Sequence, residues 1–159
     1  MKIEIDVPAQ TLVLLDDAGT VLRNYPVSTA ANGLGEEEGS NLTPRGQHIV
    51  RAKIGAGLPL RTVFRGRRPT GEIWSPELHE KFPGRDWMLS RLLWLSGREL
   101  GKNRLGKVDT MRRYIYIHGS PDLEPMGVPG SHGCVRMKNE DVAELFDLVP
   151  PYISVEIRA

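Results

Sequence analysis

The segment YIYIHG at residues 114–119 predicts both a strand of the fold and the position of a candidate functional residue, His118. Ile115 and Ile117 fall on one side of an extended chain and His118 falls on the other, so the alternation predicts a half-buried strand over the first five residues. His118 then lies at the end of this strand and points out of the core. Gly119 follows directly, and it permits a sharp turn or a close backbone approach.

The segment SHGCVRM at residues 131–137 holds the only cysteine of the chain. A single cysteine has no disulfide partner in its own chain, so Cys134 is either a small buried apolar group or a reactive thiol. A thiol attacks as its thiolate, and its ordinary pKa of about 8.5 leaves it mostly protonated at neutral pH. Activation needs a nearby group that accepts the proton, and His118 is the candidate.

Gly133, just before the cysteine, predicts a turn that binds an oxyanion. A glycine can adopt a positive φ that points successive backbone N–H groups toward one concave side. With Cys134 at the end of such a turn, the segment has both parts of an acyl-transfer site, a nucleophile and an oxyanion hole. We expect Ser131 to order the turn rather than to react.

Taken together, these residues resemble the signature of a known family. His118-Gly119, a spacer of twelve residues and the SHGCVRM segment are similar to the motif of the YkuD family, the L,D-transpeptidase catalytic domain of bacterial cell-wall enzymes. TPRG at residues 43–46 resembles the family's Thr-Pro-x-Gly turn, and LSG at residues 95–97 is also similar. The spacer is shorter than in some members, and Arg136 stands where many carry asparagine. Both departures resemble a Gram-negative type of the family.

The resemblance implies a role for each matched residue. Cys134 corresponds to the nucleophile, His118 to the base that activates it, and the backbone carbonyl of Gly119 to the group that orients the imidazole. The backbone N–H groups of His132, Gly133 and Cys134 correspond to the oxyanion hole. No metal and no organic cofactor is implied.

Three side chains are candidates for binding the substrate. Arg136 lies two positions beyond the cysteine and, in an extended segment, on the same side. Its guanidinium could hold a substrate carboxylate in a bidentate pair, or it could brace the loop through backbone carbonyls. Tyr116 shares the His118 side of the strand and Ser131 lies in the cysteine loop, so we place both in the predicted substrate site.

The implied reaction is cysteine-dependent acyl transfer at the L,D peptide bond of peptidoglycan tetrapeptides. A terminal D-alanine leaves and a thioester forms. Attack by water makes the protein an L,D-carboxypeptidase of muropeptide recycling, whereas attack by an amine makes it an L,D-transpeptidase that forms crosslinks or exchanges D-amino acids in the periplasm. We favour the carboxypeptidase, because short members of the family without a leader resemble cytoplasmic carboxypeptidases. The expected partners are peptidoglycan stem peptides or muropeptides.

Other interpretations of the central segment stay open at this point. A buried structural cysteine is the ordinary role of a lone thiol, although the ordered His-Gly and Ser-His-Gly-Cys pair disfavours it. A zinc site of His118, His132 and Cys134 would need further ligands, and no CxxC or HExxH is present. In papain-like hydrolases the cysteine usually precedes its histidine, which is the reverse of this order. The alternative from another class is a non-catalytic peptidoglycan-binding module.

Composition and charge narrow the partners and the location. The 21 lysine and arginine residues nearly balance the 20 aspartate and glutamate residues, so nothing indicates a nucleic-acid or membrane surface. Residues 2–7 alternate as a strand and form no signal peptide, and no window could span a bilayer. We therefore expect a cytoplasmic protein, or a periplasmic one if a leader has been removed. The oligomeric state stays open, with a monomer favoured.

The remaining segments predict a mainly β, single-domain protein over residues 1–159. The resemblance sharpens this to a YkuD-like β-sandwich of mixed sheets with long loops. Residues 28–40 and 72–86 predict loops, and TPRG at residues 43–46 predicts a tight turn. Besides the strand before His118, β-rich or strongly apolar runs predict strands at residues 2–7, 11–15, 20–27, 47–54, 60–65, 88–95 and 153–158.

One clear helix is predicted near the end of the chain, at about residues 139–149. Val142, Leu145, Phe146 and Val149 recur at helical spacing, and Asn139 is the predicted N-cap. The two prolines that follow end the helix.

Two groups of side chains between these elements have alternative interpretations. Trp74 and Trp87 are predicted to be packing groups. Four arginines lie within eight residues, and they either meet a carboxylate of the substrate or form a solvated edge that discourages strand pairing. They are Arg61, Arg65, Arg67 and Arg68.

Overall fold

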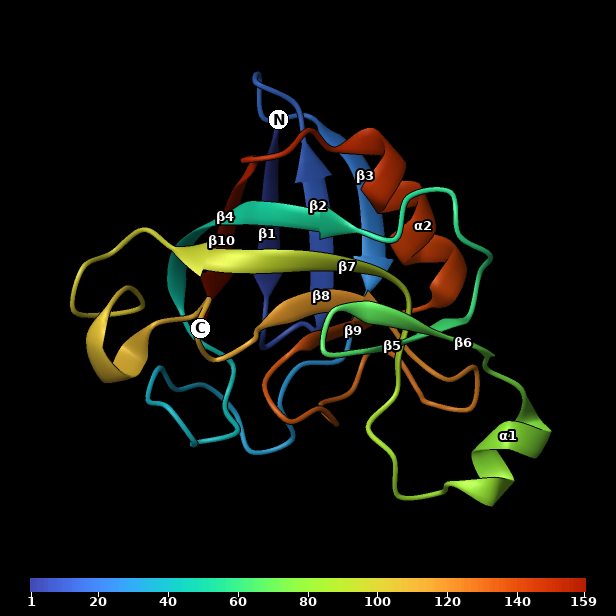
Figure 1. Cartoon of the computed structure of the whole chain (residues 1–159). Helices are drawn as coiled ribbons and strands as arrows, with labels where there is room; N and C mark the ends of the chain where they lie inside the picture. Colours follow the sequence, from blue (N-terminus) through green and yellow to red (C-terminus); the bar gives the residue numbers. More distant parts are fainter.

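A computed structural model describes all residues, Met1–Ala159, and Figure 1 shows that its strands form one curled β-sheet. Neither α-helix is long and apolar enough to cross a lipid bilayer. The strands are β1 (Lys2–Asp6), β2 (Thr11–Leu15), β3 (Val21–Pro26), β4 (Gly46–Ile54), β5 (Thr62–Arg65), β6 (Arg68–Ile73), β7 (Met88–Gly97), β8 (Tyr116–Gly119), β9 (Val135–Met137) and β10 (Ser154–Arg158). The helices are α1 (Pro76–Lys81), the single 3-10 turn η1 (Gly106–Val108) and α2 (Asn139–Leu148).

The sheet is mixed, as predicted, and it branches at β7. Its order is β3-β2-β1-β10-β4-β7-β5-β6, and β8 pairs with both β7 and β9. Only the pairs β1–β10 and β8–β9 are parallel; the other neighbours run antiparallel. The first and last strands are therefore neighbours, and β10 separates β1 from β4.

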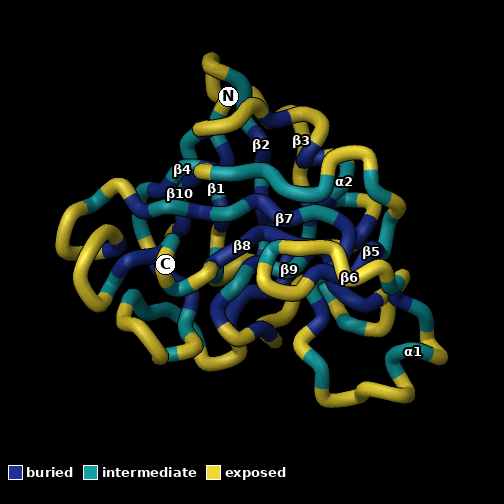
Figure 2. Tube along the Cα trace, viewed as in Figure 1, coloured by how far each residue is buried: buried dark blue, intermediate teal, exposed yellow.

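The main core lies inside the curl, between the N-terminal strands, the strands β7 to β9 and the helix α2. It contains 20 buried hydrophobic residues. Ile115 and Ile117 both belong to it, which confirms the predicted facing of that strand. Figure 2 shows β8 in the buried colour, whereas β6 at the edge of the sheet is mostly exposed. Each fully buried leucine or isoleucine stabilises the fold by about 1.5–3 kcal/mol.

A smaller core supports the segment around α1. It contains Val63, Trp74, Trp87 and Leu89, so the predicted packing role of both tryptophans is confirmed. His79 joins them: its Nδ1 accepts a hydrogen bond from Trp74 Nε1 at 3.1 Å, and its ring stacks on Trp87. This cluster fixes the chain just before β7, where that strand enters the pocket described below.

The apolar stripe of α2 faces the core as predicted, and the helix ends just before Pro150. The predicted N-cap was wrong, because Lys138 occupies that position and makes no capping hydrogen bond through its side chain. Asn139 is instead wholly buried. Its amide donates to the Ser120 carbonyl at 2.8 Å and accepts from Ser90 Oγ at 2.6 Å, so tertiary contacts use the group that would have capped the helix.

Several expectations for the connecting segments were wrong in part. Arg68–Ile73, which overlaps the predicted loop, is the strand β6 and pairs with β5; its residues are mostly exposed and polar, so no alternation marks it. Residues 43–46 form no tight turn, since Thr43 bridges Leu34 and the last of them begins β4. Residues 28–30 are buried rather than part of a surface loop.

Candidate active site

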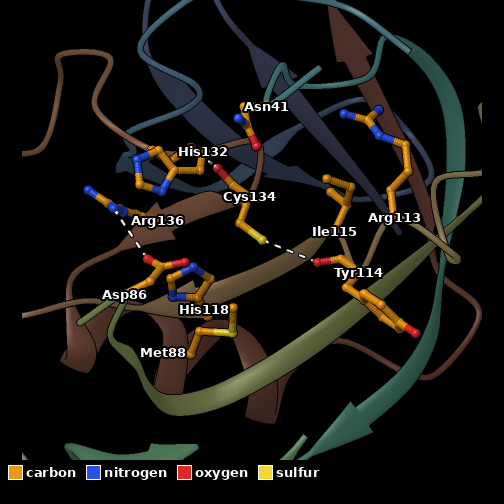
Figure 3. A pocket seen from close by; sticks show the side chains of 11 residues that line it. Asn41, Asp86, Met88, Arg113, Tyr114, Ile115, His118, His132, Cys134 and Arg136 are labelled. Carbon is orange, nitrogen blue, oxygen red and sulfur yellow. Dashed lines mark hydrogen bonds and ion pairs between the residues drawn. The ribbon is translucent and has the colours of Figure 1, made fainter. Parts of the chain in front are cut away.

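A pocket of about 300 Å³ opens beside β8 and β9 (Figure 3). The structure brings five predicted site residues to its wall, namely His118, Ser131, His132, Cys134 and Arg136. Six residues that the sequence did not single out as site residues complete the wall: Asn41, Asp86, Met88, Arg113, Tyr114 and Ile115. No group of three or more histidine, cysteine, aspartate and glutamate side chains is close enough together to hold a metal ion.

His118 is held rigidly on β8. The residue is only 2% exposed, and its Nδ1 lies 2.6 Å from the carbonyl oxygen of Gly119. A carbonyl only accepts hydrogen bonds, so Nδ1 carries the hydrogen and Nε2 keeps a free lone pair. Burial lowers the pKa of the imidazole, which keeps it neutral and able to accept a proton.

Gly119 can only be a glycine at this position. A Cβ built on it would lie 2.5 Å from Asn139 Oδ1 and 2.7 Å from the Leu89 carbonyl oxygen. The close backbone approach expected from the sequence is therefore present, and it comes from α2 on one side and β7 on the other. The carbonyl that orients His118 is fixed between these two elements.

The Cys134 thiol is not hydrogen-bonded to His118. Its Sγ donates to the Tyr114 carbonyl at 3.4 Å and accepts from the Tyr116 N–H at 3.3 Å (Figure 3). Burial of the sulfur in this position raises the pKa of the thiol to about 12, so the thiol is neutral. Rotation of the short side chain about χ1 moves Sγ between staggered positions. Activation by His118 therefore needs the thiol to leave the Tyr114 carbonyl.

The turn before Cys134 offers two free backbone donors. Gly133 has a φ of +128°, as expected for a glycine in such a turn, and its N–H donates to Ser131 Oγ at 3.2 Å. The N–H groups of His132 and Cys134 donate to no acceptor in the structure. Of the three N–H groups predicted to bind an oxyanion, the middle one is thus used inside the turn and the other two are free.

Thr43 fixes this turn from the other side. Its hydroxyl is fully buried, donates to the Gly133 carbonyl at 3.0 Å and accepts from the Ala30 N–H at 3.0 Å. The segment that resembles the family's Thr-Pro-x-Gly motif therefore acts here as a clamp on the cysteine turn. Local sequence pattern carries no signal for this contact, since 90 residues separate the two partners.

The side chain of Arg136 braces the loop and also lines the pocket. It is 13% exposed, lines the pocket and donates from Nη1 to the Gly130 carbonyl at 3.1 Å. Two carboxylates lie farther away, Asp86 at 3.6 Å and Glu124 at 3.9 Å. The guanidinium thus braces the loop while it keeps a face toward the pocket.

Tyr116 and Ser131, the other two predicted substrate contacts, have different positions, since only Ser131 lines the pocket. The Tyr116 side chain does not line the pocket; its hydroxyl accepts from Arg67 Nη1 at 3.2 Å, and its ring packs edge-on against Trp94. Its N–H alone reaches the thiol. The Ser131 hydroxyl donates to the Cys134 carbonyl at 2.6 Å and accepts from Gly133, so it orders the turn, as expected.

Sequence reasoning missed two charged residues of the pocket. Asp86 comes from the loop between α1 and β7. Arg113 is partly buried, and its guanidinium donates to the carbonyls of Leu42 at 2.6 Å and Gly35 at 3.2 Å. Both residues lie in polar connections where no periodicity distinguishes them, so only the tertiary fold brings them to the thiol.

Two further cavities share lining residues with the thiol pocket. A cavity of about 440 Å³ near the β5–β6 hairpin shares Asp86 with it. A second cavity, of about 250 Å³, shares five of its lining residues. The thiol pocket therefore has neighbouring space for a substrate larger than the pocket itself.

Comparison with known proteins gives a family match along almost the whole chain. The sequence model of the YkuD family, described as the L,D-transpeptidase catalytic domain, matches residues 1–157. No curated protein sequence matches significantly.

Solved structures with the same fold share little sequence with this chain. The L,D-transpeptidase from Mycobacterium smegmatis is 21% identical with a TM-score of 0.55, and the match covers 99% of this chain and 58% of that one. The L,D-transpeptidase from Xylanimonas cellulosilytica is 21% identical with a TM-score of 0.54, and the match covers 98% of this chain and 59% of that one. The protein Bd1075 from Bdellovibrio bacteriovorus is 16% identical with a TM-score of 0.61, and the match covers 99% of this chain and 47% of that one. The chain thus spans roughly half to three fifths of the length of these proteins.

Proposed function

The chain belongs to the YkuD family of L,D-transpeptidase catalytic domains, and we propose that it catalyses acyl transfer through a thioester on Cys134. The proposed substrate is a peptidoglycan tetrapeptide, attacked at the carbonyl of the L-configured centre of its third residue, so that a terminal D-alanine leaves. One observation carries the proposal: a lone thiol, a histidine with a free Nε2 and two unpaired backbone N–H groups line one pocket.

Each step follows from a group with a defined position. The Cys134 thiol rotates away from Tyr114, and His118 Nε2 takes its proton as the sulfur attacks the carbonyl. The oxyanion that forms is stabilised by the N–H groups of His132 and Cys134. As the C–N bond breaks, the imidazolium returns the proton to the leaving amine, and the acyl group remains as a thioester. The Gly119 carbonyl holds the imidazole in the orientation that both transfers need.

The second half of the reaction decides between two activities. We propose hydrolysis, in which His118 takes a proton from water, the resulting hydroxide attacks the thioester and the thiol is released. Transfer to an amine is the second candidate. The two cavities that share lining residues with the thiol pocket favour it, because a second peptide needs room next to the acylated site.

Mass spectrometry of a disaccharide tetrapeptide ending in D-alanine tests the proposal. The peptide is incubated with the protein, with Cys134→Ala and with His118→Ala, each with and without a free D-amino acid. We expect loss of one alanine in water with the unchanged protein, a peptide adduct on Cys134 in short incubations, and neither with Cys134→Ala.

The other outcomes each select a different conclusion. Exchange of the terminal residue without hydrolysis makes transfer the main reaction. Peptide binding without any turnover or adduct overturns the enzymatic proposal and leaves a peptidoglycan-binding module. Turnover that survives in Cys134→Ala contradicts the thioester.

A further inference from the structure

The Asn139 side chain is fully buried and lies against Gly119, the residue whose carbonyl orients His118. A Cβ built on Gly119 would lie 2.5 Å from Asn139 Oδ1 and 3.2 Å from Ser90 Oγ, so these two polar atoms pack directly on the Gly119 backbone. The mechanism above gives neither side chain a role. Two fully buried polar side chains beside the base therefore need an explanation.

The hydrogen bonds of the Asn139 amide have only one possible direction. Its nitrogen donates to the Ser120 carbonyl at 2.8 Å and to Asp122 Oδ1 at 3.1 Å, and a carbonyl or carboxylate oxygen only accepts. Its oxygen accepts from Ser90 Oγ at 2.6 Å. The Ser90 oxygen in turn accepts from the Arg61 N–H at 2.9 Å. These partners fix the amide against rotation.

Arg61 closes these contacts into a ring of four residues. Its guanidinium donates to both oxygens of Asp122, from Nε at 2.7 Å and from Nη2 at 3.2 Å. Arg61, Ser90, Asn139 and Asp122 each bind two other members, and we call them the Asn139 ring. The ring joins the segment before β5, the strand β7, the start of α2 and the loop after β8. It therefore fixes these four segments relative to one another.

Two members of the Asn139 ring have backbone conformations that glycine adopts with less strain. Ser90 has a φ of +73° and Arg61 has a φ of +65°. Ser90 also lies where β7 shifts its register against β8, and such bulges next to active sites re-aim side chains. A serine in this conformation is strained, and the hydrogen bonds of its hydroxyl, which glycine lacks, offset that strain.

We propose that Asn139 is a positioning residue for His118 and that the Asn139 ring holds its amide in place. The amide oxygen lies against Gly119 and the amide nitrogen binds the Ser120 carbonyl, so the peptide bond between these two residues is fixed on both sides. The Gly119 carbonyl then stays in line with His118 Nδ1, and the imidazole keeps its hydrogen on that nitrogen. The proposal rests on the proposed function, because only the tautomer with a free Nε2 accepts the thiol proton.

Nitrogen NMR of the His118 ring measures the expected effect. A protonated ring nitrogen and one with a free lone pair differ in chemical shift, so the spectrum of the neutral imidazole shows which nitrogen carries the hydrogen. We expect Nδ1 alone to be protonated in the unchanged protein. In Asn139→Ala the Gly119 carbonyl loses its support, so we expect both tautomers and an acylation rate lowered about tenfold. The spectrum of His118→Gln assigns the signals.

Val149→Ala is the matched control for a loss of stability. Val149 is buried at the other end of α2, and its side chain has no polar group that could join the Asn139 ring. We expect a lower thermal stability in both variants but a mixture of tautomers only in Asn139→Ala. The same mixture in Val149→Ala would mean that any loosening of α2 displaces His118, and it would overturn the specific role of Asn139.

Two substitutions of Ser90 keep the test valid if Asn139→Ala does not fold. Ser90→Ala removes the hydroxyl and keeps the strained φ, whereas Ser90→Gly removes the hydroxyl and relieves the strain. We expect Ser90→Gly to be the more stable of the two, and both to show a mixture of His118 tautomers. Protonation of Nδ1 alone in both variants would overturn the proposal. A mixture in Ser90→Ala alone would attribute the effect to backbone strain and would also overturn it.

The NMR measurement needs no turnover, which separates this inference from the proposed function. Mixed tautomers in Asn139→Ala, together with no turnover of peptide by the unchanged protein, support the positioning of His118 and overturn acyl transfer. Turnover by the unchanged protein, together with protonation of Nδ1 alone in Asn139→Ala and in both Ser90 variants, refutes the positioning role and leaves the proposed function intact.

Discussion

His118 and Cys134 face the same pocket from supports of different kinds. His118 lies on a strand, is almost fully buried, and has its Nδ1 hydrogen-bonded to a carbonyl that two neighbouring elements hold in place. Cys134 lies at the end of a short turn, and hydrogen bonds from Thr43 and Ser131 fix that turn. The thiol itself is bonded away from His118. The base is therefore oriented in advance, whereas the nucleophile has to move.

Substitution of Gly119 tests the strand side of this comparison and has the largest expected effect. In Gly119→Ala the new Cβ clashes with Asn139 and the Leu89 carbonyl, which costs about 1–3 kcal/mol of stability. Displacement of the His118 ring by about 1 Å lowers the acylation rate roughly 100-fold. Thermal unfolding and the rate of Cys134 adduct formation measure the two effects.

A matched glycine provides the control for this prediction. Gly84 has ordinary backbone angles, and a Cβ there meets nothing within 4 Å. We expect Gly84→Ala to unfold and to acylate like the unchanged protein. Normal acylation in Gly119→Ala would show that the base tolerates displacement, and the contrast between the two supports would then be lost.

Substitution of Thr43 tests the turn side. Thr43→Val keeps the shape but leaves the Gly133 carbonyl and the Ala30 N–H unpaired, at a cost of about 1–3 kcal/mol. Because the turn carries the oxyanion donors, we also expect the acylation rate to fall about tenfold. Thr43→Ser keeps the hydroxyl, so its acylation rate should stay near that of the unchanged protein. Equal losses in the valine and serine variants would attribute the effect to packing.

Substitution of Arg67 tests whether its contacts with the neighbouring aromatic rings help to hold the thiol at the Tyr114 carbonyl. Its guanidinium lies 4.8 Å from the ring centroid of Trp94 and 4.9 Å from that of Tyr114, and it donates to the Tyr116 hydroxyl. Arg67→Ala should lower the stability only slightly. Because both bonds to the thiol come from the backbone of these tyrosines, alkylation of Cys134 by iodoacetamide should become a few-fold faster. An unchanged alkylation rate would separate the aromatic contact from the position of the thiol.

The pH dependence of stability sharpens the account of the thiol. The folded protein keeps the Cys134 thiol protonated, with a pKa of about 12, while the unfolded chain ionises it above a pKa of about 8.5. Stability from this group is therefore present below pH 8.5 and is lost as the pH rises toward 12. Urea unfolding at several alkaline pH values should show a steeper loss in the unchanged protein than in Cys134→Ala. Parallel curves would place the thiol in a solvated position.

Regular periodicity is what made the strands and α2 predictable from sequence. The alternation of Ile115 and Ile117, and the helical spacing of Val142, Leu145 and Phe146, report burial on one face, and burial decides most of the folding energy. β6 gave no such signal, because this polar edge strand buries no face of its own. β6 forms by pairing with β5, and the sequence of β6 alone carries no information about that pairing.

At the site, the sequence predicted the two side chains proposed to react but not the charged residues that surround them. Cys134 and His118 stand in a recognisable pattern, and they do line one pocket. Asp86 and Arg113 come from irregular loops, so nothing local distinguishes them from solvated charges. Asn139 shows the converse: its residue type suits a helix cap, but its buried contacts with Ser90 and Ser120 take priority.

The position of β10 has a consequence for how the protein is made. This strand alone joins the part of the sheet that contains β1, β2 and β3 to the part that begins with β4. Residues 154–158 are translated after every other strand, so the two parts stay unjoined along the sheet until these residues leave the ribosome. A nascent chain stopped before them exposes the edges of β1 and β4, which are templates for pairing with another molecule. Closure of the sheet is consequently a late event in the synthesis of this domain, and removal of β10 favours aggregation over a smaller native domain.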